Sequence, residues 1–176
     1  IAAAERNLAI GSKIEGYSAE QPNRIRGGNF HGATCLREGT LVTMGDGDTK
    51  AIEAVVRGDM VMTRKGPRRV LAAAMTNPAA EIVHLSTRGT TLSLFGTADH
   101  LVFVPDRGWV MLGQLQPGEL LVRIDMGGEV VSVTPCETRA PVYDLTVVWE
   151  HEFFANGILV HNCEELAAWN NGKPDE

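Results

Sequence analysis

The sequence predicts an all-β fold, and three observations support this. Short runs rich in Val, Leu, Thr and Ile recur between Gly, Asp and Pro residues through the middle of the chain, which is typical of short strands joined by tight turns. No stretch of this region keeps a long 3.6-residue apolar period, as an amphipathic helix would. Hydrophobic residues make up 44% of the 176 residues and charged residues 22%, a composition that supports a globular core and argues against wholesale disorder.

The expected strands follow one another along the middle of the chain. In order they cover residues 41–44, 60–62, 82–85, 91–95, 101–104, 130–133 and 143–148. Residues 45–48 form the turn after the first strand, Gly58-Asp59 precedes the second, and residues 125–129 are expected to be a hairpin tip. The Ala-rich residues 1–10 are compatible with the end of a helix and residues 164–170 with the start of one, but each flank is too short to bury a core.

The middle of the chain also repeats itself at an offset of 60 residues without a gap. In both copies a strand is followed by a turn, a short apolar stretch and then Gly, an acidic residue and an apolar residue. The aligned pairs are Leu41-Val42 with Leu101-Val102, Asp46 with Asp106, Ile52 with Leu112, Val55 with Leu115, Gly58-Asp59 with Gly118-Glu119, and Val61 with Leu121. One interpretation is coincidence among common residues. The other is a pseudo-symmetric β domain built from two similar halves, which internal self-similarity often marks.

Charge and composition exclude several classes of protein. The net charge of −6 argues against a broad basic surface for nucleic acid and leaves only a local groove open. No window approaches the ~18 consecutive apolar residues that a membrane span needs. The chain begins at Ile1 with no Met and no signal pattern, so a fragment or a processed chain is expected. Three scattered cysteines do not make a disulfide framework and fit the reducing cytosol. A cytoplasmic monomer is therefore expected.

The tripeptide His161-Asn162-Cys163 has a specific chemical possibility. The side-chain amide of Asn162 can attack its own backbone carbonyl and cleave the following peptide bond, leaving a succinimide. His161 can assist by donating a hydrogen bond or a proton, and Cys163 can accept an acyl group through its thiolate. Alone the tripeptide is a weak signal, which an ordinary surface turn explains equally well.

Three further motifs accompany the tripeptide. Residues 35–42 read Cys-Leu-x-x-x-Thr-x-Val, residues 97–100 read Thr-x-x-His, and residues 142–157 combine Val-Tyr-Asp-Leu-Thr-Val with His-x-Phe-x-Ala-Asn-Gly. Together, and in this order, the four motifs resemble the splicing blocks of an intein, a self-splicing domain of the Hint fold. The resemblance covers residues 35–162. It implies a horseshoe-like β domain with pseudo-two-fold symmetry, which agrees with the internal repeat.

The resemblance implies the following roles in the first part of splicing. Cys35 would attack the carbonyl of Thr34 and convert that amide into a thioester. Thr97 and His100 would polarise or strain the bond, and His100 would protonate the departing amine. Asp144 would couple this step to the next one by tuning the thiols.

The remaining roles concern the second junction. Cys163 would take the acyl group by transthioesterification, which gives a branched chain. Asn162 would then cyclise and release the intein, helped by His161 and by His151. A spontaneous S-to-N shift would join Thr34 to Cys163.

The resemblance also divides the chain into three parts. Residues 1–34 would be an N-extein, residues 35–162 a mini-intein, and residues 163–176 a C-extein. The interval between the second block and the last two lacks a homing endonuclease, so no DNA cleavage is expected. The domain would act once, on its own flanking exteins, rather than as a turnover enzyme. Two alternatives stay open: a bacterial intein-like or hedgehog-type domain that mainly cleaves, and a non-catalytic β interaction module.

The flanks carry a resemblance of their own. Joined together, residues 16–34 and 163–169 resemble the ATPase domain of a phage terminase large subunit, the motor that packages viral DNA. The insertion would lie at the Walker B motif, with Glu164 at the Mg²⁺-handling position and Glu165 as the catalytic carboxylate. The family usually has Asp where Glu164 stands. No Gly-rich phosphate loop is present, so this fragment is not expected to hydrolyse ATP.

The other candidate residues have simpler explanations. Cys136 matches no splicing block and is expected to be a packed or partly exposed thiol. His84 lies in a strand-like run and is expected to be structural, and His31 is incidental. No Cys/His cluster has the spacing of a zinc finger, so neither a metal nor a cofactor is expected.

Overall fold

The computed structural model describes residues 34–89, 92–125 and 127–162. Regular structure in these residues consists of β strands and two short 3-10 turns, η1 (Ile52–Ala54) and η2 (Leu112–Gln114). The all-β prediction is confirmed. None of the described segments forms a helix that is long and apolar enough to cross a membrane. The helical segments expected at residues 1–10 and 164–170 lie outside the described residues.

The strands form two antiparallel sheets. The first has eight strands in the spatial order β10 (Leu120–Leu121), β11 (Gly128–Pro135), β6 (Val83–Arg88), β7 (Leu94–Gly96), β1 (Leu36–Arg37), β12 (Ala140–Val147), β5 (Gly66–Ala80) and β4 (Met60–Thr63). The second has six strands in the order β3 (Thr49–Ala51), β2 (Leu41–Thr43), β13 (Glu152–Ala155), β14 (Ile158–His161), β8 (Leu101–Val104) and β9 (Gly108–Met111).

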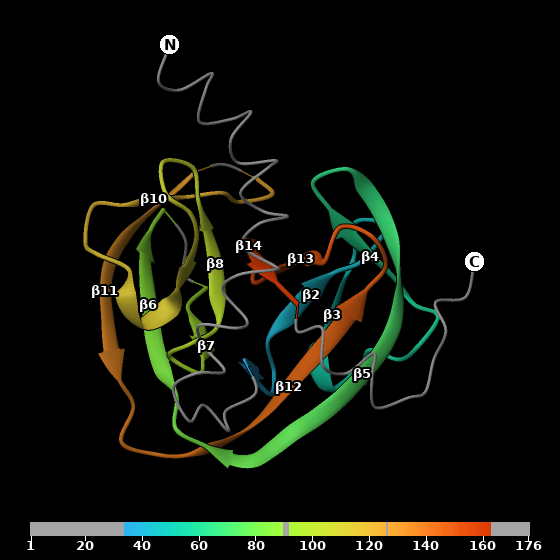
Figure 1. Ribbon diagram of the computed structural model, residues 1–176, viewed down its shortest axis with the longest axis horizontal. Helices are drawn as coiled ribbons and strands as arrows, with labels where there is room; N and C mark the ends of the chain where they lie inside the picture. The colour runs from blue at the N-terminus through green and yellow to red at the C-terminus, as the bar shows by residue number, and fades with distance from the viewer. Residues whose placement is uncertain (1–33, 90–91, 126, 163–176) are drawn as a thin grey trace.

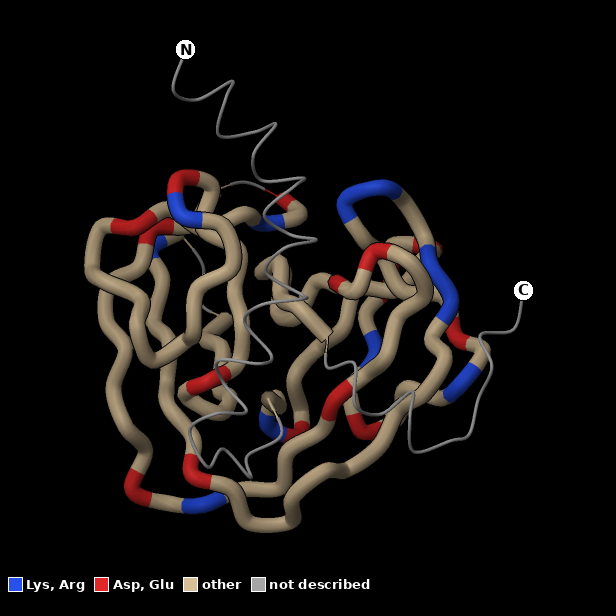
Figure 2. Tube along the Cα trace, in the orientation of Figure 1, with Lys and Arg blue, Asp and Glu red and all other residues tan. Residues whose placement is uncertain are grey.

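Figure 1 shows two lobes, with β13 and β14 between them. One lobe contains β6, β7, β8, β10 and β11, and the other contains β2, β3, β4 and β5. The long strands β5 and β12 run side by side along one lobe and continue around the lower edge of the molecule. Charged residues lie mainly on turns and margins, and a group of Lys and Arg lies on the hairpin that joins β4 to β5 (Figure 2).

The internal repeat is a structural repeat, because backbone hydrogen bonds recur at the same offset of 60 residues. Gly58 N donates to Val70 O at 2.9 Å, and Gly118 N donates to Val130 O at 2.8 Å. The same correspondence holds for three further pairs of bonds: Val70 N to Asp59 O and Val130 N to Glu119 O, Ile52 N to Thr40 O and Leu112 N to His100 O, and Thr40 N to Arg37 O and His100 N to Thr97 O. Coincidence among common residues does not explain these repeated bonds.

The repeat also orders the strands. Each of the strands β1 to β6 has a counterpart about 60 residues later, namely β7 to β12 in the same order. In the eight-stranded sheet, the strands met from one edge are therefore the counterparts of those met from the other edge, and the β7–β1 pair lies at the centre. The second sheet is likewise symmetric about the β13–β14 hairpin. The pseudo-two-fold axis thus passes between β1 and its own counterpart, where Leu36 pairs with Gly96.

The core fills the space that the two halves enclose. Apolar residues from both halves form one large buried cluster, which includes Leu36, Ile52, Leu85, Leu94, Leu112, Leu145, Phe153 and Ile158. All four residues of β13 are buried, as are the first three of β14. Burial of a side chain of this size contributes about 1.5–3 kcal/mol of hydrophobic free energy. The hairpin that precedes Asn162 is therefore held firmly in the core.

The longest strand was not expected from the sequence. Residues 66–80 form the 15-residue strand β5, although Gly66, Pro67, Pro78 and the Ala-rich run between the prolines disfavour a strand. The strand forms because β12 pairs with it over most of its length, and three irregularities in register accommodate the mismatch. The two prolines lie close to its ends, where a missing N–H costs least.

Gly96 gives the first prediction. A Cβ at this position would lie 2.9 Å from the backbone oxygen of Cys35 and 3.0 Å from Leu36 Cδ2, so β1 and β7 approach each other only with glycine here. Gly96→Ala should lower the free energy of unfolding by about 1–3 kcal/mol through overpacking. Urea unfolding measures this in chains that also carry Cys35→Ala and Asn162→Ala. Gly127→Ala is the control, because its Cβ would meet no heavy atom within 4 Å. Equal losses in both variants would contradict the close approach.

Candidate functional site

The peptide bond between Thr34 and Cys35 leads directly into a central strand. Leu36 pairs with Tyr143 of β12 on one side and with Gly96 of β7 on the other. Cys35 is completely buried. Extending the antiparallel register by one residue places Cys35 opposite Asp144, which is also completely buried and accepts a hydrogen bond from Leu145 N at 2.8 Å. Cys35, the predicted nucleophile, and Asp144, the predicted coupling carboxylate, are therefore neighbours on adjacent strands.

Thr97 holds the backbone of Cys35 on both sides. The N–H of Cys35 donates to Thr97 Oγ1 at 3.0 Å, and Thr97 N donates to the carbonyl oxygen of Cys35 at 2.9 Å. Burial raises the pKa of Asp99, while a hydrogen bond with the Thr97 side chain acts in the opposite direction. The Thr97 hydroxyl oxygen accepts from the Cys35 N–H, and its single proton has two acceptors within reach, the Asp99 carboxylate and the Cys35 carbonyl oxygen at 3.4 Å. Thr97 thus fixes the nitrogen that would leave when the Thr34–Cys35 bond is broken.

His100 faces the same bond from a dry environment. Burial lowers its pKa to about 4; interaction with the Thr34 backbone raises it in part, and the charge of His161 lowers it further. The ring is therefore neutral near pH 7. Neither ring nitrogen makes a full hydrogen bond within the part of the chain that the structure describes. An imidazole with such a low pKa is a strong acid once it is protonated, which suits proton delivery to an amine.

The second junction also leaves a central strand, because β14 lies between β13 and β8. The His161 ring contacts the carbonyl oxygen of Asn162, with Nδ1 at 2.6 Å. Since a carbonyl only accepts, Nδ1 carries the proton in this contact. Burial lowers the pKa of His161 to about 4, and this pKa is raised by the Asn162 carbonyl and lowered by the charges of His151 and Arg64. A neutral imidazole therefore polarises the carbonyl that Asn162 would attack.

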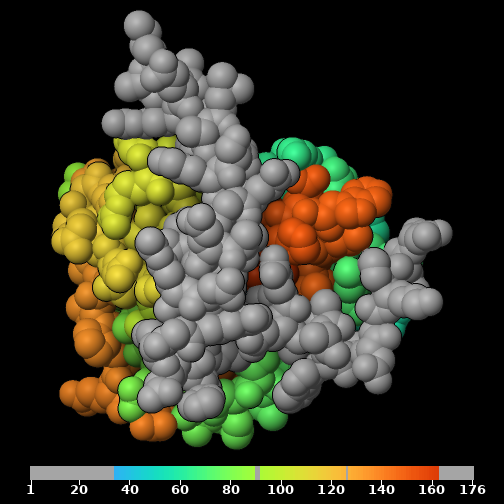
Figure 3. Space-filling model, viewed as in Figure 1, coloured from blue at the N-terminus to red at the C-terminus, as the bar shows by residue number. Residues whose placement is uncertain are grey.

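His151 contributes its backbone to the same site. Its carbonyl accepts a hydrogen bond from Asn162 N at 2.9 Å, and its ring lies 6.5 Å from that of His161 at an interplanar angle of 19°. Trp149 and His151 both have positive φ, 63° and 52°, which is an uncommon backbone conformation for such residues. Figure 3 shows this turn between β12 and β13 as an orange surface beside the green β5. The strained turn aims the His151 carbonyl at Asn162.

The structure thus places the sequence-predicted residues in two adjacent groups. Cys35, Thr97, His100 and Asp144 surround the first junction, and His151, His161 and Asn162 surround the second. The electrostatic interaction of His100 with His161 links the two groups. Cys163 lies outside the described residues, as do Glu164, Glu165 and His31. Asn162 is almost fully buried, at 2% exposure.

A charged pair beside His161 was not expected from the sequence. Arg64 binds the carboxylate of Glu152 with Nε and Nη2 at 2.7–3.0 Å, and its guanidinium lies over the ring of Phe103 at 4.3 Å. Glu152 is the cross-strand partner of His161, and Trp109 meets the His161 ring edge to face at 4.8 Å. Arg64 therefore neutralises a carboxylate that lies next to His161.

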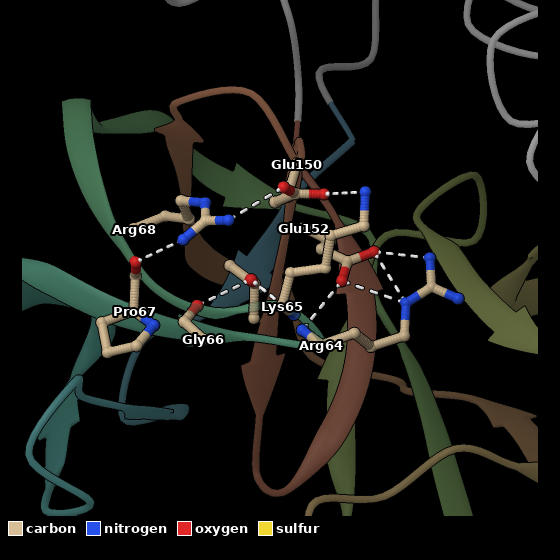
Figure 4. A network of polar contacts seen from close by, with 8 residues as sticks. Arg64, Lys65, Gly66, Pro67, Arg68, Glu150 and Glu152 are labelled. Carbon is tan, nitrogen blue, oxygen red and sulfur yellow. Dashed lines mark hydrogen bonds and ion pairs between the residues drawn. The ribbon is translucent and has the colours of Figure 1, made fainter.

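Figure 4 shows the rest of this network, which fixes the turn before His151. Lys65 and Arg68 both reach the carboxylate of Glu150 at 3.2 Å, and Glu152 also accepts a hydrogen bond from the backbone N–H of Arg64. No sequence motif marks these residues. The network ties the β4–β5 hairpin to the strand that leads to the second junction.

The remaining candidate residues, His84 and Cys136, belong to neither of these two groups. His84 stacks on Phe95 with ring centroids 4.5 Å apart, as expected for a structural histidine. Cys136 is half-buried and packs against the small apolar cluster that contains Cys35. Within residues 34–89, 92–125 and 127–162 no group of three or more His, Cys, Asp or Glu side chains is arranged to hold a metal ion.

Comparison with solved structures gives the same fold. The gp41-1 intein matches 74% of this chain and its own full length, with a TM-score of 0.66 and 22% identity. A DnaB intein from Synechocystis sp. PCC 6803 matches 74% of the chain and 99% of its own length, with a TM-score of 0.64 and 24% identity. The chain has the Hint fold of inteins. A bacterial intein-like domain from Clostridium thermocellum shares this intein fold at a TM-score of 0.64 and 26% identity, over 74% of this chain and all of its own. No protein-family model and no curated protein sequence matches the chain significantly.

The Arg64–Glu152 pair gives a stability prediction. Arg64→Met should lower the free energy of unfolding by about 2–3 kcal/mol, because it leaves the carboxylate of Glu152, only 3% exposed, without its cation. Urea unfolding of the Cys35→Ala, Asn162→Ala chain measures the loss. The matched control is Arg88→Met, which removes an exposed ion pair with Glu129 and should cost less than about 0.5 kcal/mol. If both substitutions lowered the free energy of unfolding by a similar amount, burial of the Arg64–Glu152 pair would not contribute to stability.

The lowered pKa values of His100 and His161 give a pH prediction. In the folded chain His100 and His161 titrate near pH 4, below the ordinary value of 6.5, so the unfolded chain binds protons first. Their stabilising contribution is complete above pH 6.5 and is lost as the pH falls toward 4. Unfolding free energies of the Cys35→Ala, Asn162→Ala chain should therefore fall across this window. Adding His100→Gln and His161→Gln should flatten the curve, and parallel curves would contradict the lowered pKa values.

Proposed function

We propose that this chain is a self-splicing precursor in which residues 35–162 are a mini-intein. One observation carries the proposal: protein groups contact both peptide bonds that splicing would break. Thr97 holds the nitrogen of the Thr34–Cys35 bond at 3.0 Å, and His161 lies 2.6 Å from the carbonyl oxygen of the bond after Asn162. The intein fold of the comparison structures supports the same function. A non-catalytic β interaction module would not need these contacts.

The first steps use the groups around Cys35. The thiol attacks the Thr34 carbonyl carbon, the S–C bond forms, and the C–N bond to Cys35 breaks. The proton lost by sulfur is balanced by the proton gained at the Cys35 nitrogen, which His100 delivers once it is protonated. Thr97 keeps that nitrogen in position, and the buried Asp144 across the strand pair tunes the thiols for the next transfer. Cys163 then takes the acyl group through its own thiol.

The last step uses the groups around Asn162. The side-chain nitrogen attacks the backbone carbonyl of the same residue, and the bond to Cys163 breaks with formation of a succinimide. His161 Nδ1–H stabilises the developing oxyanion, and the His151 carbonyl fixes the Asn162 backbone. This step is the irreversible one, because the preceding acyl transfers exchange bonds of similar energy. The products are a free intein and a chain in which Thr34 is joined to Cys163.

The joined product is proposed to be part of a phage terminase large subunit. Joining residues 1–34 to 163–176 would restore a continuous Walker B region with Glu164 and Glu165 side by side. The intein would act once, in the cytoplasm of the infected or lysogenic cell, with its own exteins as substrate and without a metal or cofactor. DNA packaging by the host protein would then wait for splicing.

A second candidate is a domain that mainly cleaves and does not ligate. The fold match to the bacterial intein-like domain of Clostridium thermocellum favours it. Mass spectrometry of the expressed chain separates the two. Splicing gives a ligated product of residues 1–34 and 163–176 together with the free intein, whereas a cleaving domain releases the flanks unjoined. An intact chain that stays unchanged would instead indicate a non-catalytic module.

The proposed steps predict opposite defects in two variants. Asn162→Ala should allow the early steps, so that hydroxylamine or dithiothreitol releases residues 1–34, but no fragment that begins at Cys163 should appear. His100→Ala should suppress release of residues 1–34 while some release of the C-terminal piece persists. Cys35→Ala should abolish ligation and leave cyclisation of Asn162 possible. Mass spectrometry over time gives all three results.

The matched control is Cys136→Ala, the same substitution at a thiol outside both junctions, and it should splice like the parent chain. Ligated product from Cys35→Ala would refute the assigned nucleophile. A free fragment starting at Cys163 from Asn162→Ala would refute the cyclisation step.

A further inference from the structure

One hydroxyl reaches the sulfur of Cys35 from a strand that carries none of the splicing motifs. Thr76 Oγ1 lies 2.6 Å from Cys35 Sγ, although the two residues are 41 positions apart in the chain. The same oxygen lies 3.3 Å from the backbone carbonyl of Val142. Thr76 belongs to β5, the strand that the sequence did not predict. Thr76 therefore contacts the sulfur atom that would react, whereas Thr97 contacts the backbone of Cys35.

The backbone at Thr76 is shaped to make this contact. Along the β5–β12 pair, Asn77 faces Val142 and Met75 faces Tyr143, so Thr76 is an extra residue with no partner of its own in the register. Such a β-bulge turns the side chain of the extra residue, and bulges occur often beside active sites. The neighbouring positions 75 and 77 are exposed, whereas Thr76 is half-buried. The bulge therefore points one hydroxyl of an otherwise Ala-rich strand at Cys35.

The hydrogen-bond geometry allows two orientations of the Thr76 hydroxyl. When Thr76 donates to Val142 O, which can only accept, the thiol of Cys35 must donate to Thr76 Oγ1. When the sulfur has lost its proton, the hydroxyl can rotate and donate to sulfur instead. Apart from the departure of the thiol proton, the two arrangements differ only by rotation of the Thr76 hydroxyl hydrogen. Cys35 is completely buried, and a charged sulfur in such a site needs a donor, because water does not reach it.

We propose that Thr76 is a further catalytic residue of the first acyl shift, which holds the Cys35 thiol in line before attack and donates a hydrogen bond to sulfur as it loses its proton. This inference rests on the proposed splicing function. The bonds and protons of the step are those given above. The bond from Cys35 Sγ to the Thr34 carbonyl carbon forms, and the bond from that carbon to the Cys35 nitrogen breaks. The thiol loses one proton and this nitrogen gains one. Thr76 gains and loses no proton overall.

The test measures release of residues 1–34 by dithiothreitol in the Asn162→Ala chain, in which the last step is blocked. Thr76→Val keeps the branched shape and suits a strand, but it removes the hydroxyl. The release rate at neutral pH should fall about 10- to 100-fold, as expected for a hydrogen bond to a charged group. The rising limb of the pH–rate profile should also move to higher pH. Thr76→Ser, which keeps the hydroxyl, should restore the rate to within about threefold.

The control is Thr87→Val, the same substitution at a buried hydroxyl of β6 that has no hydrogen-bond partner within the described segments. Its release rate should equal that of the parent. If Thr76→Val does not fold, the ratio of the Thr76→Ser and Thr76→Ala rates isolates the hydroxyl, since both lack the methyl group. Parent-like rates and pH profiles in Thr76→Val, or equal rates in the Ser and Ala variants, would overturn the role of Thr76 and leave the proposed function standing. No release from the parent would overturn the proposed function, and this inference with it.

Discussion

The structure depends on one constraint: both ends of the described domain are central strands. Strand β1 lies between β7 and β12, with Leu36 paired on both sides, and β14 lies between β13 and β8. An edge strand could move away from its sheet at the cost of a single row of hydrogen bonds, but a central strand cannot. Cys35 and Asn162 are thereby fixed to rigid β structure, and in the proposed splicing reaction this preorganisation would substitute for the entropy of bringing reacting groups together.

A second property of the site is that His100 and His161 are neutral near pH 7. His100 and His161 both have a pKa of about 4, chiefly because burial disfavours their charged forms. Each can then donate a hydrogen bond or pass on a proton without holding a permanent charge near the junctions. Arg64 belongs to the same arrangement, because its ion pair with Glu152 cancels a carboxylate that would otherwise favour a charged His161.

The sequence predicts much of this and fails in a consistent way. Strands with β-branched residues and clear turns were predicted well, as at residues 101–104, and the offset of 60 residues is visible in the sequence because turn glycines and core positions recur. Strand β5 was missed because its stability comes from pairing with β12 rather than from its own residues. Thr76 and Arg64 were missed for the same reason, since each acts on a partner 41 or 88 positions away and no local pattern encodes such a contact.

The repeat shows how two equivalent backbone turns can carry different side chains for different purposes. The turn at Arg37 to Thr40 and the turn at Thr97 to His100 share the same backbone bonds, and Leu36 pairs with its own counterpart, Gly96. The pseudo-two-fold axis therefore passes beside Cys35, and the second copy of the turn that follows Cys35 lies against it. In one copy this position is Thr40, which only caps its own turn by donating to Arg37 O. In the other copy this position is His100. The two turns have equivalent backbones, so the side chain at this position alone distinguishes the structural turn from the turn that faces the Thr34–Cys35 peptide bond.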